Sequence, residues 1–137
     1  MAKPAPAGYS GKPLHAKLGF KPGWRVGLVD PRGHYRALVD GAEGVSFVFD
    51  TSGLDAVHLF LAGPDKIAGR ASDAIARLRD GGMLWISWTK KSSRLFRGVS
   101  EDDLRAAILP LGWVDVKVCA IDSDWSGLKF LRRKDRA

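Results

Sequence analysis

Residues 83–91, of sequence MLWISWTKK, constrain the fold of this chain more than any other stretch. Residues 83–89 form a nearly continuous apolar run, which is typical of a strand covered on both faces, as in parallel sheets. Gly81 and Gly82 precede the run, and Lys90 and Lys91 close it. Ligands of such sheets bind outside the carboxyl ends of the strands. The stretch therefore predicts an α/β protein in which Lys90 and Lys91 stand beside any ligand site.

Turn residues and apolar periodicity divide the rest of the chain into short strands and helices. The expected strands are residues 24–30, 45–49, 54–61, 83–89, 114–121 and 125–131. The expected helices are residues 13–18, 34–39, 63–80 and 101–111. The pattern predicts a mostly parallel, twisted sheet of about six strands, with helices on both faces and an antiparallel C-terminal hairpin.

The link between the second and third strands is too short for a crossover helix, which a parallel return normally needs. Either the second strand is short and the chain crosses the sheet in an extended form, or the second strand is an edge strand that pairs in another way. Ser10 is expected to cap the first helix, and Ser100 with Asp103 resembles the capping box of the last helix.

A chain of 137 residues is predicted to be one domain. We expect residues 1–8 to be a disordered tail, residues 9–133 a single α/β domain, and residues 134–137 a basic tail. No apolar run approaches the ~20 residues of a membrane span, and the N-terminus lacks the apolar core of a signal peptide. The expected location is therefore the cytoplasm. Cys119 is the only cysteine, so an internal disulfide is excluded and a buried apolar role is expected.

The net charge of +7 is located at the two ends of the chain. Residues 1–23 carry lysines and no acids, residues 132–137 are also basic, and the stretch between them is electrically balanced. Basic ends can bind nucleic acid weakly and without specificity, but they are more often solvated tails. The distribution therefore argues against nucleic acid as the main partner. His15 and Lys17 are expected to lie on the surface.

Candidate ligand contacts follow the first strand and lie late in the third. His34 and Tyr35 come directly after the first strand, where they are placed to contact a ligand. The alternative for His34 is that it caps the loop. His58 lies near the end of the third strand and has two interpretations. It either faces the crevice as an acid or base, or it is a hydrogen-bonded residue of the core.

Lys90, Lys91, Arg94 and Arg97 form the densest positive cluster between the termini. At the carboxyl end of a strand they are placed to hold the phosphate or carboxylate of a small anionic ligand through charge-assisted hydrogen bonds. The alternative is a solvated loop.

No signature of a metal site or of a catalytic set is present in the sequence. Asp122 and Asp124 are expected to bond the backbone of their own turn, and no metal is predicted. The sequence shows no Ser-His-Asp set, zinc pattern or phosphate-binding loop, so no catalytic residue is assigned.

Four passages resemble class I S-adenosylmethionine-dependent methyltransferases, each matching one part of that fold. They are KPGWRV at residues 21–26, LDAVHL at 54–59, LRDGGMLWIS at 78–87, and LGWV at 111–114 with the hairpin through residue 125. Together they span roughly residues 20–133. The resemblance implies a methyltransferase-like, Rossmann-like scaffold and S-adenosylmethionine as the cofactor.

The chain also resembles, over nearly all its length, a bacterial family of small proteins of unknown function. The matching passages are YSGKPL at residues 9–14, KLG at 17–19, VHLF at 57–60, SW at 87–88, KK at 90–91, VDVKVCA at 114–120 and WSGLK at 125–129. This resemblance implies no particular activity, but it draws attention to Ser87, Trp88, Lys90 and Lys91.

The loop after the first strand departs from the methyltransferase pattern. Those enzymes carry Asp/Glu-x-Gly-x-Gly-x-Gly there, because glycine lets the backbone approach the ligand. This chain has DPRGHY at residues 30–35, where only Gly33 remains and proline restricts the backbone. Asp30, Gly33 and Asp50 are the weak cofactor-binding candidates, with Asp50 placed where an acid would meet ribose hydroxyls. The altered loop argues against S-adenosylmethionine, so no cofactor is predicted.

The first functional hypothesis is therefore a non-catalytic, ligand-binding or regulatory module on a methyltransferase-like scaffold. The second is an enzyme, a divergent methyltransferase acting on a small anionic or nucleotide-like substrate. It rests on the expected convergence of His34, Tyr35, His58, Lys90 and Lys91 at one edge of the sheet. Weak binding of nucleic acid through the basic tails is the third.

Overall fold

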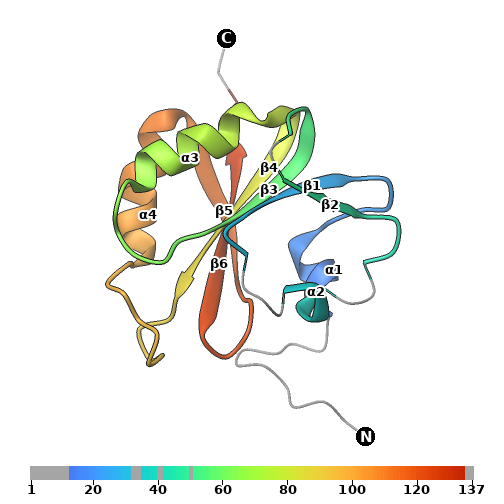
Figure 1. Ribbon diagram of the computed structural model, residues 1–137. Coiled ribbons are helices and arrows are strands. Elements are labelled where there is room, and N and C mark those ends of the chain that lie inside the picture. Colours follow the sequence, from blue (N-terminus) through green and yellow to red (C-terminus); the bar gives the residue numbers. More distant parts are fainter. Residues whose placement is uncertain (1–12, 32–34, 40–41, 50, 135–137) are drawn as a thin grey trace, which may run out of the picture.

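The computed structural model describes residues 13–31, 35–39, 42–49 and 51–134. Six strands of this described part form one sheet in the order β2-β1-β3-β4-β6-β5 (Figure 1). They are β1 (Arg25–Val29), β2 (Ser46–Val48), β3 (Leu54–Phe60), β4 (Leu78–Thr89), β5 (Trp113–Ala120) and β6 (Trp125–Arg132). Strands β1 to β4 pair in parallel, whereas β6 is antiparallel to both β4 and β5. The predicted α/β fold with an antiparallel hairpin is confirmed.

Helices cover both faces of the sheet, as predicted. They are α1 (Leu14–Leu18), α2 (Tyr35–Leu38), α3 (Ile67–Ala76), α4 (Glu101–Ile108) and the 3-10 turn η1 (Leu109–Leu111). Helices α3 and α4 pack on one face, while α1 and α2 lie on the other (Figure 1). The result is a three-layer arrangement with a separate apolar core on each side of the sheet.

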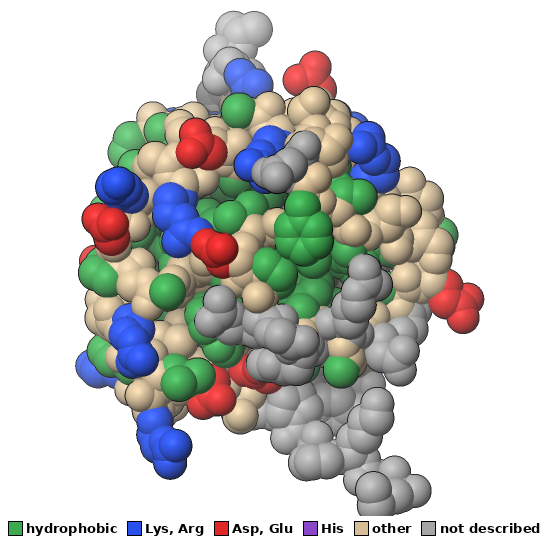
Figure 2. Space-filling view, in the orientation of Figure 1, with side chains coloured by type: hydrophobic (Ala, Val, Ile, Leu, Met, Phe, Trp, Pro, Cys, Tyr) green, Lys and Arg blue, Asp and Glu red, His purple; other side chains and the backbone are tan. Residues whose placement is uncertain are grey.

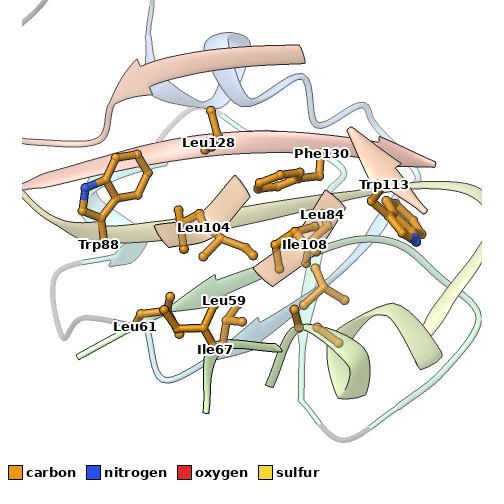
Figure 3. Packing of buried hydrophobic residues seen from close by; sticks show 14 of the residues in the cluster. Leu59, Leu61, Ile67, Leu84, Trp88, Leu104, Ile108, Trp113, Leu128 and Phe130 are labelled. Carbon is orange, nitrogen blue, oxygen red and sulfur yellow. The ribbon is translucent and has the colours of Figure 1, made fainter. Parts of the chain in front are cut away.

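Alternation along β4 sends its side chains into both cores. Leu84 points toward α3 and α4, where Leu59, Leu104 and other apolar residues surround it (Figure 3), and Ile86 belongs to the same core. Trp85 points to the other face, is fully buried, and donates its indole N–H to the carbonyl oxygen of Leu18 at 2.9 Å. Burial on both faces explains why the sequence of this strand is almost continuously apolar.

The helix ends follow the expected local signals. Ser100 and Asp103 form a reciprocal capping box at the start of α4, in which each side chain accepts from the backbone N–H of the other residue. Gly19 ends α1 in the left-handed conformation, with φ of 78°. Ser10 lies outside the described residues, and the residue that precedes α1 is Pro13.

Helix α3 is shorter than the predicted helix over residues 63–80. It begins only after Lys66, which has a left-handed φ of 56°, and it ends at Ala76. The prediction extended too far because Leu78 continues the helical spacing of apolar residues from Ala71 and Ala74. In the structure Leu78 instead starts β4, opposite Leu54 of β3.

The start of β4 contains a bulge. This bulge explains Gly81 and Gly82, which were predicted to end the helix. The pairing shifts from Leu54 opposite Leu78 to Ala56 opposite Met83, so β4 accommodates extra residues there. A Cβ on Gly82 would lie 3.0 Å from the carbonyl oxygen of Arg79. Glycine is therefore required for the chain to fold back closely at this point.

Strand β2 has features of both alternatives for its link to β3, because it is short and it is an edge strand of the sheet. Strand β2 is only three residues long, and it pairs in parallel with one side of β1 while β3 pairs with the other. Val48 is level with Gly27, and Ala56 is level with Val26. The chain therefore needs to return only a short distance between β2 and β3, and the predicted crossing itself includes Asp50, which lies outside the described residues.

Other expectations for the chain outside the core have mixed outcomes. Cys119 is half-buried on β5 rather than fully buried. The predicted tails at residues 1–8 and 134–137 lie outside the described residues, except for the exposed Lys134. Among the described helices, none combines the length and the apolar character that crossing a membrane requires.

Candidate functional site

The candidate site lies at the carboxyl ends of the parallel strands, where Val29, Phe60 and Thr89 end β1, β3 and β4. Of the predicted residues, Asp30, Tyr35, His58, Lys90, Lys91 and Arg94 are described, and His34, Gly33 and Asp50 lie outside the described residues. The described candidates form three separate groups: a buried polar chain, an ion pair after β1, and the loop after β4.

Tyr35, His58 and Ser87 form a hydrogen-bonded chain through the core. The hydroxyl of Tyr35 lies 2.9 Å from Nδ1 of His58, and Nε2 of His58 lies 2.6 Å from Oγ of Ser87. Tyr35 comes from the turn of α2, whereas His58 and Ser87 come from the neighbouring strands β3 and β4. A neutral imidazole has one donor and one acceptor nitrogen, so both hydroxyls are satisfied whichever tautomer is present.

Burial keeps the three hydrogen-bonded side chains electrically neutral. Tyr35 is 2% exposed, and His58 and Ser87 are fully buried. Burial lowers the pKa of His58 from 6.5 to about 3, and it raises the pKa of Tyr35 above its ordinary value. Each shift has the same cause, because the low-dielectric interior disfavours the charged form. At neutral pH none of the three side chains carries a charge.

The Ser-His pair is inaccessible in this conformation. Both side chains are fully buried, and strand β6 lies directly beside Ser87 in the sheet, where a Cβ on the paired Gly127 would lie 3.1 Å from the Ser87 Oγ. The histidine has a tyrosine hydroxyl as its second partner, where a catalytic triad would have a carboxylate. The arrangement thus matches the core interpretation of His58, and it stabilises the packing between β3, β4 and α2.

Aromatic rings surround this polar chain. His58 stacks on Phe60 with ring centroids 4.4 Å apart, and Tyr35 makes edge contacts with Phe47 and Phe60 at 5.7 and 5.6 Å. These contacts are of the offset and edge-to-face kind that aromatic pairs prefer. Side chains of the protein itself therefore fill the α2 face beside the carboxyl ends of β1 and β3.

Asp30 follows β1 directly and has a left-handed φ of 51°. Its carboxylate pairs with the guanidinium of Arg70 on α3. The ion pair links the end of β1 to α3, which covers the same face of the sheet as α4.

The loop after β4 is anchored to the β5–β6 hairpin. The backbone N–H of Lys90 donates to the carbonyl oxygen of Asp124 at 2.8 Å, and the Ser93 hydroxyl donates to the Asp124 carboxylate at 2.8 Å. Lys91 and Arg94 are exposed, and Lys90 is partly exposed. Among the described residues, none of these three cations takes part in an ion pair.

The remaining polar residues near this loop are engaged by the protein. The Arg97 guanidinium donates to the backbone carbonyls of Leu95 and Phe96 at 2.9 and 3.1 Å. Asp122 accepts the backbone N–H groups of Asp124 and Trp125, each at 2.8 Å. This is the bonding within the turn that the sequence predicts for Asp122.

The structure brings Tyr35 and His58 together but does not link them to the cationic loop. Within the described residues, no hydrogen bond, ion pair or ring contact joins either of them to Lys90, Lys91 or Arg94. Ser87 is the hydrogen-bonding partner of His58 that residue spacing did not identify. Its position two residues after Trp85 could have placed it on the same face, but its pairing with His58 depends on the register of β3 and β4.

Hydrophobic side chains gather at the centre of one face of the molecule (Figure 2). The exposed large apolar residues include Phe49, at the end of β2, with 59% of its surface accessible.

Solved methyltransferases share this fold over most of the chain. A Sulfolobus solfataricus protein described as a type 11 methyltransferase has a TM-score of 0.63 and 14% identity, covering 93% of this chain and 92% of its own. Burkholderia thailandensis 1,6-didemethyltoxoflavin-N1-methyltransferase, solved with 1,6-didemethyltoxoflavin and S-adenosylhomocysteine, has a TM-score of 0.57 and 15% identity over 88% and 75%.

Aeropyrum pernix fibrillarin, solved with natively bound S-adenosyl-L-methionine, has a TM-score of 0.54 and 15% identity, covering 85% of this chain and 73% of its own. No family model matches the sequence, and neither does any curated protein. At these identities the similarity concerns the fold: the chain is a single α/β domain of the methyltransferase-like, Rossmann-like type.

Proposed function

We propose that this protein is a non-catalytic, ligand-binding or regulatory module on a methyltransferase-like scaffold. One observation carries the proposal: Tyr35, just after β1, is packed into the core and hydrogen bonded to His58. A side chain of the protein thus occupies the face beside the strand ends where α/β proteins of this type hold their ligands. We also propose that the chain is related to the bacterial family of small proteins that its sequence resembles.

The residues at the end of β1 do not fit S-adenosylmethionine. A glycine-rich loop lets the backbone approach a cofactor, but here Asp30 is held by Arg70 and is followed by Pro31. Tyr35 makes edge contacts with Phe47 and Phe60 on the α2 face of the sheet, and a cofactor held on that face would have to displace these rings.

A small anionic ligand is the better candidate for this edge of the sheet. Lys90, Lys91 and Arg94 supply positive charge without an ion-pair partner among the described residues. The bonds of Lys90 and Ser93 to Asp124 hold the loop in place. Ammonium and guanidinium groups form short, charge-assisted hydrogen bonds with carboxylate or phosphate oxygens.

Calorimetric titration tests whether the protein binds S-adenosylmethionine. The intact chain is titrated with S-adenosylmethionine and with S-adenosylhomocysteine, and we expect no dissociation constant below about 1 mM. Micromolar binding of either compound would refute the proposal.

Chemical-shift mapping tests the anion site, with malonate and adenosine monophosphate as the probes. We expect shifts in the backbone signals of Lys91 and Arg94 that saturate with probe concentration and are lost in the variant Lys91→Gln/Arg94→Gln. Lys134→Gln, which removes an exposed charge after β6, is the matched control and should leave the shifts intact. Shifts that are absent, or that persist in the double variant, would remove the loop as a ligand site.

A divergent methyltransferase acting on a small anionic or nucleotide-like substrate is the second candidate function. It is favoured by the cationic loop at the carboxyl ends, together with solved neighbours that hold S-adenosylmethionine or S-adenosylhomocysteine. It requires that Tyr35 leave the core when the cofactor binds. The same titration decides between the two functions, because only the enzyme binds the cofactor.

A further inference from the structure

Four lysines gather around the C-terminal end of α1, away from the loop after β4. They are Lys17 of α1, Lys21 three residues after the end of α1, Lys117 of β5 and Lys129 of β6. We call these four residues the lysine cluster. The ammonium of Lys117 donates to the carbonyl oxygen of Lys17 at 2.8 Å. The ammonium of Lys129 lies 3.9 Å from the position that a Cβ on Gly19 would occupy. The α1 segment thus sits against the two strand lysines.

The pairing of the hairpin makes this cluster electrostatically unfavourable. Lys117 and Lys129 are direct partners across the antiparallel strands β5 and β6, and like charges in that position destabilise a sheet. Burial, followed by the positive charges of Lys117 and Lys21, lowers the pKa of Lys129. Every ion pair among the described residues uses an arginine, so none neutralises these lysines.

Lys17 is the most unusual member of the cluster. The sequence predicts a surface position for it, whereas only 8% of its surface is exposed. None of the hydrogen bonds or ion pairs of the described residues gives its ammonium a partner. Lysine is almost never buried without a partner, although its apolar stem can be covered while the charged end reaches water. The positive charges of Lys17 and Lys117 both act on Cys119 of β5, where they oppose the burial that raises the pKa of its thiol, so the Lys17 ammonium adds positive charge to this side of the hairpin.

One lysine has a structural role that needs no ligand. Lys117 donates to a carbonyl at the end of α1, and cations there satisfy the last carbonyls of a helix. That contact accounts for a single donor of Lys117 and leaves the ammonium groups of Lys17, Lys21 and Lys129 without an acid among the described residues. Lys21 lies over the ring of Trp24, 5.8 Å from its centroid.

We propose that the lysine cluster binds the phosphate group of a small molecule. Ammonium groups donate and cannot accept, so the site calls for an acceptor with several oxygens and more than one negative charge. Phosphate meets both needs, and lysine binds it as a point charge. The four lysines converge on one place, whereas a protein that follows a nucleic-acid strand presents a longer groove with stacking aromatic residues. The proposal concerns a second site, independent of the function proposed above.

Titration of the intact chain with inorganic phosphate and pyrophosphate, at constant ionic strength, tests this site. We expect saturable binding, with pyrophosphate tighter than phosphate, and loss of at least about tenfold in affinity in Lys129→Gln, because a charged hydrogen bond contributes about 1.5–3 kcal/mol. Lys129→Arg should retain most of the affinity. Lys134→Gln, which removes an exposed charge that belongs to neither proposed site, should not change it.

Circular dichroism and thermal unfolding show whether each variant is folded, and Lys21→Gln provides a second variant in which no strand residue is altered. Failure of the wild-type chain to bind pyrophosphate below about 10 mM would overturn the proposal. So would equal affinity in the wild type, Lys129→Gln and Lys21→Gln. Binding of an RNA oligonucleotide that pyrophosphate does not displace would replace it with a nucleic-acid surface.

Discussion

Acid should destabilise this protein through His58, whose ring is fully buried and hydrogen bonded at both nitrogens. Burial lowers the pKa of His58 from 6.5 to about 3 in the folded chain, while the solvated ring of the unfolded chain keeps its ordinary value of about 6.5. Between these two values the unfolded chain binds a proton that the folded chain does not. The free energy of unfolding therefore decreases as the pH falls below about 6.5.

The size of the effect follows from the distance between the two pKa values. Each pH unit below the unfolded pKa lowers the free energy of unfolding by about 1.4 kcal/mol, so the loss between pH 8 and pH 5 is about 2 kcal/mol. Near pH 3 the loss approaches about 4 kcal/mol, which is a large part of the ~5–15 kcal/mol that stabilises an ordinary domain.

Urea unfolding at pH 8 and at pH 5 measures this difference. His58→Gln should be less stable than the wild type at pH 8, because at least one hydroxyl of Tyr35 or Ser87 loses its partner, but it should lack the loss of about 2 kcal/mol on acidification. His15→Gln removes a histidine of α1 that has no such burial, and it should keep the wild-type pH dependence.

Proton NMR of the imidazole rings provides a direct measurement that needs no unfolding. The His58 signal should not titrate between pH 8 and pH 5 in the folded chain. A titration midpoint for His58 above about 5.5 would refute the reasoning, and so would an equal loss of stability in the wild type and His58→Gln.

Two further substitutions test the packing and the helix cap. Gly127→Ala should lower the free energy of unfolding by about 1–3 kcal/mol in urea, because its Cβ would lie 3.1 Å from the Ser87 Oγ. Gly69→Ala in α3, which meets nothing within 4 Å, is the control and should be neutral or stabilising; an equal loss at both sites would contradict this account. Ser100→Ala should cost about 1 kcal/mol by removing the cap of α4, and an unchanged thermal midpoint would show that the capping box contributes nothing.

Local signals were sufficient to predict the elements whose stability is decided locally. The apolar run at residues 83–89 predicts a strand that is buried on both faces. In the structure this run lies in β4, between β3 and β6. The Ser100–Asp103 pair encodes its own cap, since both partners lie within one turn of α4. The capping partners are close in the sequence, whereas the run of β4 indicates its own burial without indicating which residues cover it.

The same local reasoning misplaced the boundary between α3 and β4. Leu78 satisfies the helical spacing as well as it satisfies a strand, so periodicity alone could not end the helix. What decides the outcome is a contact with a distant strand: the Arg79 guanidinium bonds the Asp55 carboxylate at 2.6 Å, next to the pairing of Leu54 with Leu78. The hydrogen bond between His58 and Ser87 was not predicted for a similar reason, because the two residues meet only through the register of β3 and β4.

The charge distribution shows how sequence order and spatial order can differ. Counted along the chain, the basic excess lies at the ends and the interior is balanced, which favours solvated tails. In space, Lys17 of the basic N-terminal segment lies against Lys117, 100 residues further along. Asp115, which lies on the same strand as Lys117, does not neutralise it, because Asp115 is bonded by Arg105 of α4 on the other face of the sheet. A neutral interior in the sequence is therefore compatible with a concentrated positive charge in the fold, and it is this concentration that a phosphate group would neutralise.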